Sequence, residues 1–126
     1  MPLGHGVDLV KIDRIKRAYT RLGQAFLDRI YTTDELALCR NQDGTYRWPS
    51  LAGRFAGKEA LAKALGTGIS GGVTFLDMEI LADSMGQPRV RLHGKYQELF
   101  IKQGYQTVVL SLSHERDYAI ASCILA

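Results

Sequence analysis

The chain has 126 residues, of which 46% are hydrophobic and 23% charged, and its formal net charge is +3. This length predicts a single domain over residues 1–126, and its small size favours association with copies of itself. The mild positive charge suggests an anionic partner and leaves nucleic acid, an acidic protein and a phosphorylated small molecule open. Cys39 and Cys123 form no CxxC pair, which argues against a disulfide scaffold or a zinc site. We see no secretory signal and no apolar stretch long enough to span a bilayer, so we expect a cytoplasmic protein.

The first two predicted elements are a strand and a helix. Residues 5–10 alternate in the manner of a strand, with Val7 and Leu9 on one face and Asp8 on the other. A helix over residues 12–22 follows, because the apolar positions then recur at helical spacing. The residues of this helix that we expect to face the core are Ile15, Ala18, Tyr19 and Leu22.

The middle of the chain contains the clearest helix. A capping box over residues 32–35 opens a shorter helix, and residues 41–46 form a loop with an Asp-Gly turn. Residues 51–65 form the long helix, which Gly66 ends. One stripe of this helix is apolar (Leu51, Phe55, Ala62, Leu65) and a neighbouring stripe is small (Ala52, Ala56, Ala60, Ala64). The small residues predict close packing.

The last part of the chain predicts mostly strands. After a glycine-rich segment, 66–72, we expect strands over 75–81 and 89–92 and a short helix over 95–103. Residues 107–112 and 118–125 then form a hairpin around a tight turn. The whole pattern is typical of an α+β fold with helices packed on an antiparallel sheet.

Two acids and a lysine are the first candidates for chemistry. Asp8 lies within an apolar strand, where a carboxylate needs a partner, and the ordinary alternative is an exposed position or an ion pair. Glu59 and Lys63 are four residues apart on the long helix, so an ordinary exposed ion pair is the alternative for them. Both point toward the glycine-rich segment, whose backbone can approach a phosphate closely and present N–H groups to it. Together these features favour a metal–diphosphate site.

The glycines and the lone histidine allow other interpretations. Residues 66–71 match the GxGxxG dinucleotide fingerprint, but here the pattern follows a helix and precedes a strand, so we reject that match. His114 ends a predicted strand and is a candidate general base or phosphate ligand, although a histidine beside a turn is often only structural. On the helix over 12–22, one flank is basic, and this flank is either solvated or a docking surface for an acidic partner. Its members are Lys11, Arg14, Arg17 and Arg21.

The sequence resembles the small holo-acyl-carrier-protein synthases, one group of phosphopantetheinyl transferases, over essentially its whole length. Three blocks with the family's order and spacing carry the likeness: GVDLVKIDRI (6–15), RFAGKEALAKALGTG (54–68) and SLSHERDYAIA (111–121). The departures are small. His5 stands where we expect a small or apolar residue, and Gly57 stands where alanine is commoner, which loosens the helix slightly.

The resemblance implies a Mg2+-dependent transfer of phosphopantetheine from coenzyme A to a serine of an apo acyl carrier protein. In such enzymes a strand aspartate and a helix glutamate hold Mg2+ on the diphosphate, which here implies Asp8 and Glu59. Lys63 would reach the same diphosphate. The resemblance also places five residues at the nucleotide: Arg54, Gly66, Thr67, Gly68 and His114.

The remaining implications concern the base, the partners and the assembly. A metal-associated water, Glu59 and His114 are all candidates for removing the serine proton. Arg14, Arg17 and Arg21 would bind the acidic carrier protein. The family is typically homotrimeric, with each active site between two subunits.

Two other function classes fit the sequence less well. A non-catalytic coenzyme A or nucleotide-binding module could dispense with one carboxylate, so the presence of both Asp8 and Glu59 argues against it. An RNA-binding protein would interleave aromatic and basic residues on its sheet, whereas the predicted strands are mostly aliphatic. We therefore expect neither a nucleic acid nor a membrane as partner.

Overall fold

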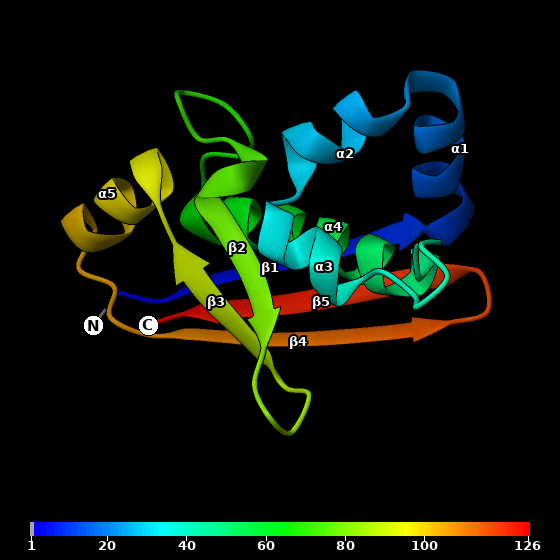
Figure 1. Cartoon of the computed structure of the whole chain (residues 1–126). Coiled ribbons are helices and arrows are strands. Elements are labelled where there is room, and N and C mark those ends of the chain that lie inside the picture. The colour runs from blue at the N-terminus through cyan, green and yellow to red at the C-terminus, as the bar shows by residue number, and fades with distance from the viewer. Residues whose placement is uncertain (1) are drawn as a thin grey trace.

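The structure, a computed structural model, describes residues 2–126 and has the α+β architecture that the sequence predicts (Figure 1). The elements follow in the order β1 (Gly4–Lys11), α1 (Ile12–Leu22), α2 (Gln24–Ile30), α3 (Thr33–Leu38), α4 (Trp48–Leu65), η1 (Phe75–Asp77), β2 (Met78–Ala82), β3 (Pro88–Leu92), α5 (Gly94–Lys102), β4 (Val108–Glu115) and β5 (Tyr118–Leu125). The strands form two antiparallel sheets rather than one, with the orders β1-β5-β4 and β2-β3. No helix within the described residues is both long and apolar enough to cross a membrane.

The larger sheet joins the two ends of the chain. β5 is its central strand, and β1 pairs with β5 in antiparallel register, from Gly4 opposite Leu125 to Lys11 opposite Tyr118. β4 pairs with the other edge of β5, which confirms the predicted hairpin. Both termini consequently lie at the same end of the molecule (Figure 1).

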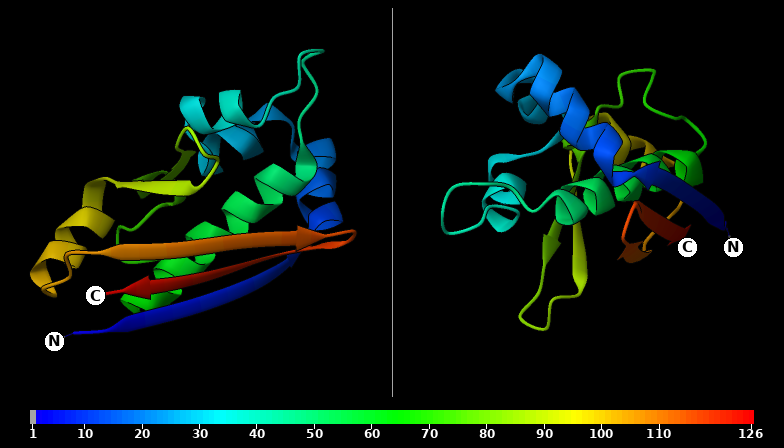
Figure 2. Two further views of the ribbon diagram at one scale, coloured as in Figure 1. Left: turned by 90° about the horizontal axis from the view of Figure 1, so that it is seen from below. Right: turned by 90° about the vertical axis from the view of Figure 1, so that its right-hand side faces the viewer.

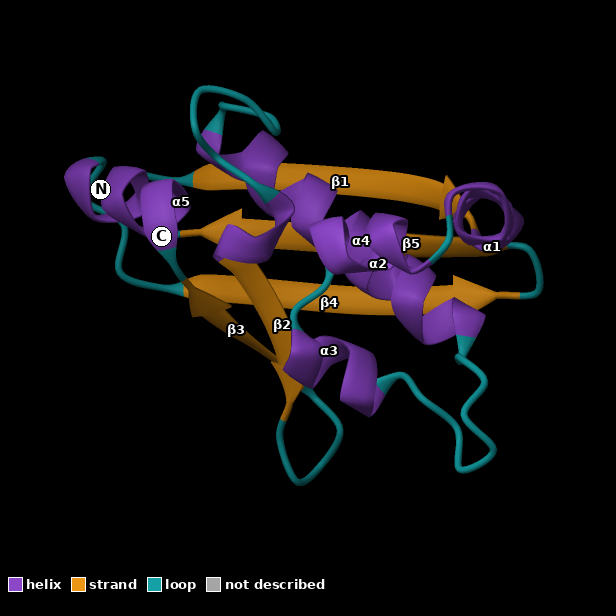
Figure 3. Ribbon diagram, turned by 45° about the horizontal axis from the view of Figure 1, so that its top comes forward, coloured by secondary structure: helices purple, strands orange, loops and turns teal. Residues whose placement is uncertain are grey.

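Helix α4 crosses one face of this sheet, as Figures 2 and 3 show. The contact is close because β1 has glycine where it faces the helix. A Cβ atom on Gly6 would lie 2.0 Å from the carbonyl oxygen of Ala60, and one on Gly4 would lie 2.5 Å from that of Ala64. The alanines of the small stripe are all buried, which confirms the close packing predicted for that stripe.

The opposite face of the sheet carries several exposed large apolar side chains among polar ones, and no element of the described chain covers it (Figure 2). In β1 the aliphatic Val7 and Leu9 lie on this outer face, 48% and 60% exposed, whereas Asp8 lies on the inner face beside α4. The outer face carries further exposed large apolar side chains from the other two strands: Val109, Tyr118, Ile120 and Ile124. The usual arrangement of a strand, with apolar side chains inside, is therefore inverted at residues 7–9 of β1, whereas Val10 is buried on the inner face as usual.

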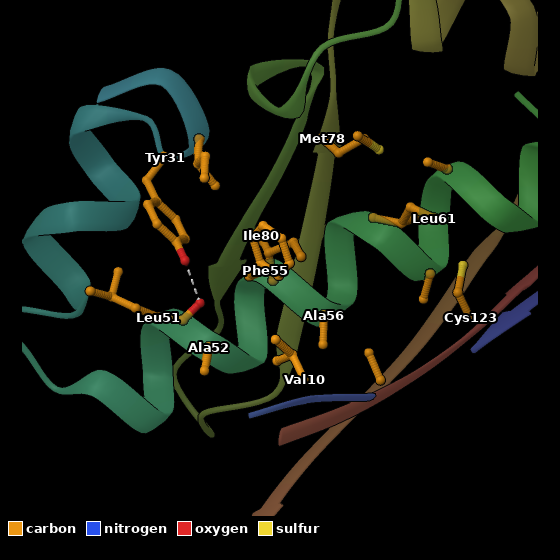
Figure 4. Packing of buried hydrophobic residues seen from close by; sticks show 14 of the residues in the cluster. Val10, Tyr31, Leu51, Ala52, Phe55, Ala56, Leu61, Met78, Ile80 and Cys123 are labelled. Atoms are coloured by element: carbon orange, nitrogen blue, oxygen red, sulfur yellow. Dashed lines mark hydrogen bonds between the residues drawn. The ribbon is translucent and has the colours of Figure 1, made fainter. Parts of the chain in front are cut away.

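The core lies between α4, the inner face of the sheet and the smaller elements around the helix (Figure 4). Tyr31 is buried there and donates its hydroxyl proton to the carbonyl of Leu51, at 2.7 Å. The predicted capping box forms at the start of α3, because the Thr32 hydroxyl accepts from the Glu35 amide and the Glu35 carboxylate accepts from the Thr32 amide.

Three details differ from the sequence-based expectations. The sequence did not predict α2, which begins directly after Gly23; this glycine has φ 75° and reverses the chain. Leu22 is 55% exposed, so its predicted place in the core is wrong; it lies at the end of α1, on a groove described below. The expected strand over 75–81 starts three residues late, because a capping box between Thr74 and Asp77 turns the chain into η1 first.

Candidate active site

Three of the predicted site residues meet where β1 passes α4. Asp8 lies on the inner face of β1, and its side chain is only 16% exposed. The Lys63 ammonium of α4 donates to the Asp8 carboxylate at 3.0 Å and to the Val7 carbonyl at 3.1 Å. Within residues 2–126 Lys63 forms no ion pair with Glu59, so the alternative of an ordinary ion pair along the helix is wrong.

Glu59 lies near Asp8 and Lys63, because the charges of both residues affect its pKa. Burial raises the pKa of Glu59 above its ordinary value of 4.5, and the negative charge of Asp8 raises it further, while Lys63 and Arg14 oppose the shift. Two carboxylates from different elements therefore lie within reach of each other's charge. Such a pair favours the binding of an added cation.

The described residues contain no group of three or more histidine, cysteine, aspartate or glutamate side chains that could hold a metal ion. A metal bound here would consequently take at most two protein carboxylates. Mg2+ is commonly bound in this way, with substrate phosphates and water as its other ligands. The donor set of Asp8 and Glu59 therefore fits Mg2+ on a phosphate substrate better than it fits a closed, structural metal site.

The glycine-rich segment begins at the end of α4, but its first amides are not free. Gly66 is a left-handed C-cap with φ 90°, as predicted. The N–H groups of Gly66, Thr67 and Gly68 all point to the carbonyl of Ala62, at 3.1–3.3 Å. The expectation that this loop presents these N–H groups to phosphate is thus not met. What the segment offers instead is close approach of the backbone and a Thr67 side chain that donates to the Gly68 carbonyl.

Arg54 and His114 lie elsewhere in the chain. They line a cavity of about 240 Å3 together with Ser50 and Ser113, and neither Asp8, Glu59 nor Lys63 borders it. Arg54 and Glu59 are separated because they are five residues apart on α4, so their side chains leave different sides of the helix. Arg54 is held by its Nε, which donates to the Ile80 carbonyl at 2.8 Å. One chain therefore contains two separate halves of the predicted site.

The predicted basic flank of α1 borders a groove of about 500 Å3. The groove is lined by four cations and two aromatic side chains, namely Lys11, Arg14, Arg17, Arg21, Phe26 and Phe55. Arg14 lies with its guanidinium carbon 5.6 Å from the centre of the Phe55 ring, and its charge also reaches Glu59. Arg17 is already paired with Asp13 at 2.7 Å, so the flank is less basic than the sequence suggests. Neither Asp8, Glu59 nor Lys63 lines this groove, and the link between the two regions is Arg14, which lines the groove and whose charge acts on Glu59.

Sequence reasoning missed two features of this region. Phe26 was missed because α2 was not predicted. Lys58 was treated as part of a motif, but its side chain is fully buried and bonds to Glu35 at 2.7 Å. The signal was present, because Lys58 lies seven residues after Leu51 and three after Phe55, on the apolar stripe of α4. A lysine in that stripe must find a buried partner.

Comparison with known proteins places the chain in a family. Residues 4–123 match the model of the 4'-phosphopantetheinyl transferase superfamily. The chain is 46% identical to a holo-[acyl-carrier-protein] synthase of Halorhodospira halophila, over 99% of the chain and 98% of the relative. It is 41% identical to the one of Ruminiclostridium cellulolyticum, over 96% and 90%.

Solved structures agree with the sequence relatives. The chain superimposes on a holo-[acyl-carrier-protein] synthase of Neisseria meningitidis with a TM-score of 0.87 and 38% identity, covering 98% of this chain and 97% of the other. For the Helicobacter pylori enzyme, whose crystal structure contains coenzyme A, the TM-score is 0.84 and the identity 33%, with 97% and 99% covered. Sequence, fold and site geometry lead to one conclusion: the chain belongs to the 4'-phosphopantetheinyl transferase superfamily and, within it, to the family of holo-[acyl-carrier-protein] synthases.

Proposed function

We propose that this protein transfers the 4'-phosphopantetheine group of coenzyme A to a serine of an apo acyl carrier protein, in a Mg2+-dependent reaction. The family and the coenzyme A bound to a related structure support this activity. The observation that carries the proposal is the contact of Lys63 with Asp8 beside Glu59, whose charge also interacts with Arg14 of the basic groove. This arrangement provides a site for a charged diphosphate beside a surface for an acidic protein.

Asp8 and Glu59 are the residues that would hold Mg2+, with the remaining ligands supplied by the diphosphate and water. When bound, the ion neutralises negative charge on the diphosphate and on the leaving group. Lys63 is half exposed, so its ammonium can reach the same diphosphate while its stem stays beside Asp8. The protein's own contribution is mainly orientation and electrostatic stabilisation.

In the reaction, the serine oxygen of the carrier protein forms a bond to the β-phosphorus of coenzyme A, which bears pantetheine. The bond from that phosphorus to the bridging oxygen breaks, and adenosine 3',5'-bisphosphate leaves. The serine proton is taken up at the Asp8–Glu59 end of the site. We assign His114 to the nucleotide instead, because it lines the same cavity as Arg54.

The α1 groove is the surface that we assign to the carrier protein. Arg14 and Arg21 are exposed cations on its rim, and Phe26 and Phe55 supply apolar contact. A partner with acidic side chains around its serine would be guided along the groove toward Glu59. Arg17 contributes less to this attraction, since Asp13 already compensates its charge.

We also propose a homotrimer with each active site between two subunits. Two features support it. The outer face of the larger sheet exposes Val7 and Leu9 directly beside Asp8, as a subunit interface would require. In addition, Arg54 and His114 lie apart from Glu59 in one chain, so a neighbouring copy is needed to complete the site. Such a head-to-tail contact closes into a ring.

The activity is tested by mass spectrometry of an apo carrier protein incubated with the enzyme, coenzyme A and Mg2+. The carrier protein should gain the mass of one phosphopantetheine with the wild type, and Asp8→Ala or Glu59→Ala should abolish most of this gain while the fold is retained. The double variant should be little worse than either single variant, since residues that act as a unit are not additive. A wild-type protein that modifies no carrier protein would contradict the proposal.

Mixing experiments test the shared site. Glu59→Ala and Arg54→Ala impair different halves of the site, so mixed trimers should contain some intact sites and regain activity. The control mixes Asp8→Ala with Glu59→Ala, which impair the same half and should regain none. Equal behaviour of the two mixtures, or a monomer in light scattering at assay concentration, would contradict the shared site.

We further propose a cytoplasmic location. Cys39 and Cys123 are both free and buried, which fits a reducing compartment. Burial raises the pKa of the Cys123 thiol to about 12, so the thiol stays protonated and unreactive in the folded state.

A further inference from the structure

A fully buried ion pair joins α4 to α3 inside the fold. The Lys58 ammonium and the Glu35 carboxylate are 2.7 Å apart, and both side chains are 0% exposed. A buried ion pair often stabilises a fold no better than a well-packed apolar pair, because both charges lose their hydration. Its presence therefore calls for a reason other than stability.

The contacts of the pair supply that reason, because they reach main-chain groups at both ends of one segment. Lys58 donates to the carbonyl of Phe75 at 2.9 Å, at the start of η1. Glu35 accepts from the amide of Ile80 at 2.9 Å, in the middle of β2. The pair thus holds the backbone of residues 75–80 against α4, which apolar side chains could not do.

This segment in turn fixes parts of both half-sites. The Ile80 carbonyl accepts from Arg54 Nε at 2.8 Å and so orients the guanidinium that lines the 240 Å3 cavity. Phe75 follows the glycine-rich segment, whose other end is tied to α4 by the amide of Gly66 on the Ala62 carbonyl. Because Lys58 holds Phe75, the glycine-rich segment is anchored to α4 at both ends.

We propose that the Glu35–Lys58 pair is a positioning pair for coenzyme A: it fixes Arg54 and the glycine-rich segment relative to Glu59 without touching either substrate. The inference rests on the proposed function, since it names what holds that site in place. Neither member of the pair lines the α1 groove. Loss of the pair should therefore weaken coenzyme A and leave the carrier protein largely unaffected.

The test compares the wild type with the double variant Glu35→Leu/Lys58→Met, which removes both charges and keeps apolar volume. We expect this variant to fold, because replacing both members of a buried pair is tolerated better than breaking it. Its Kd for coenzyme A by calorimetry, and its KM for coenzyme A, should rise about tenfold, the effect of losing roughly one net hydrogen bond. Its KM for the carrier protein should stay within about twofold, the scatter expected where no contact has been lost.

A control separates positioning from stability. Leu36→Ala removes a buried apolar side chain next to Glu35 but no contact to the 75–80 backbone, so it should lower the melting temperature and leave the Kd for coenzyme A unchanged. If the double variant does not fold, Glu35→Gln/Lys58→Met carries the test, because it leaves no unpaired buried charge and keeps one acceptor oxygen near the Ile80 amide; a smaller rise in the same Kd is then expected.

An unchanged Kd for coenzyme A in the folded variant would overturn the inference, and so would equal losses for both substrates. A wild type that binds no coenzyme A in the parallel titration would instead overturn the proposed function itself. The two failures are therefore distinguishable.

Discussion

The close packing of β1 on α4 can be tested by adding a single methyl group to β1. Gly6→Ala adds a methyl group that would lie 2.0 Å from the Ala60 carbonyl oxygen and 2.8 Å from the Ala64 amide nitrogen. Both are backbone atoms inside a helix, so no side chain can rotate to make room. The strand and the helix must separate instead, and Asp8 moves with the strand.

The size of the effect follows from the overlap. Ordinary van der Waals contact begins near 3.4 Å. The two elements must therefore part by roughly 1 Å or more, a gap that forfeits a quarter to a half of the dispersion energy of each contact across the interface. Overpacking of this kind costs about 3 kcal/mol, a large share of the stability of a small domain.

Two other glycines provide matched controls on α4. Gly53 has nothing within 4 Å of its missing Cβ, so Gly53→Ala should stabilise the helix by about 0.5–1 kcal/mol. At Gly57 the new methyl would lie 2.7 Å from Ile80 Cδ1 and 3.2 Å from Leu112 Cδ2, which are side-chain ends rather than backbone atoms. There the gain in helix propensity and the crowding should roughly cancel, to within about 1 kcal/mol.

Urea denaturation of the three variants measures the series, since the midpoint shifts with stability at constant slope. We expect the order Gly53→Ala above wild type, Gly57→Ala near it and Gly6→Ala well below. Gly6→Ala should also weaken Mg2+-dependent coenzyme A binding, because the Asp8–Glu59 pair is pulled apart. A Gly6→Ala protein within about 0.5 kcal/mol of the wild type, the range of neutral surface changes, would refute the reasoning.

Three further predictions concern the charges of the site. Glu59→Gln should inactivate the enzyme yet stabilise the free protein by about 0.5 kcal/mol at neutral pH. Because the folded-state pKa of Glu59 is raised, the wild type loses stability as the pH rises from 4.5 through that pKa. In thermal melts, the stability advantage of the variant should therefore vanish below pH 4.5. Lys63→Met keeps the stem but loses the charge, so turnover should fall steeply while the KM for carrier protein changes little, and unchanged turnover would mean that Lys63 serves only Asp8. Arg14→Glu should raise the KM for carrier protein but not that for coenzyme A, and added salt should screen this effect. Arg17→Glu should have a smaller effect, because Arg17 is already paired with Asp13. Equal losses for both substrates would show that the groove is no docking surface.

Much of the fold could be predicted because local patterns and tertiary packing agree. The periodicity of α1, the capping box of α3 and the hairpin of β4 and β5 each depend on neighbours in sequence, and all three are confirmed. α4 was also predicted, although the structure starts it three residues earlier, at Trp48. That Asp8 and Lys63 share a site was implied by the family resemblance, and the structure shows them in contact.

What could not be predicted depends on which side of an element faces which neighbour. The alternation in β1 puts Val7 and Asp8 on opposite faces of the strand but does not say which face is inside, and in the structure Asp8 is on the inner face. In the same way, Arg54 and Glu59 belong to one motif yet leave opposite sides of α4. The N–H groups at the start of the glycine-rich segment were expected to face a phosphate, but the C-cap geometry of α4 directs them to the Ala62 carbonyl.

The position of β5 between β1 and β4 has a consequence for synthesis on the ribosome. β1 emerges early, but its pairing partner is the strand that ends at Leu125, so almost the whole chain separates the two. Until β5 leaves the exit tunnel, β1 has no neighbour to pair with and the apolar stripe of α4 has no complete sheet to cover it. Such non-local pairing folds slowly and leaves apolar surface exposed in the meantime. We therefore expect Asp8 and Glu59 to come together only after β5 has left the exit tunnel.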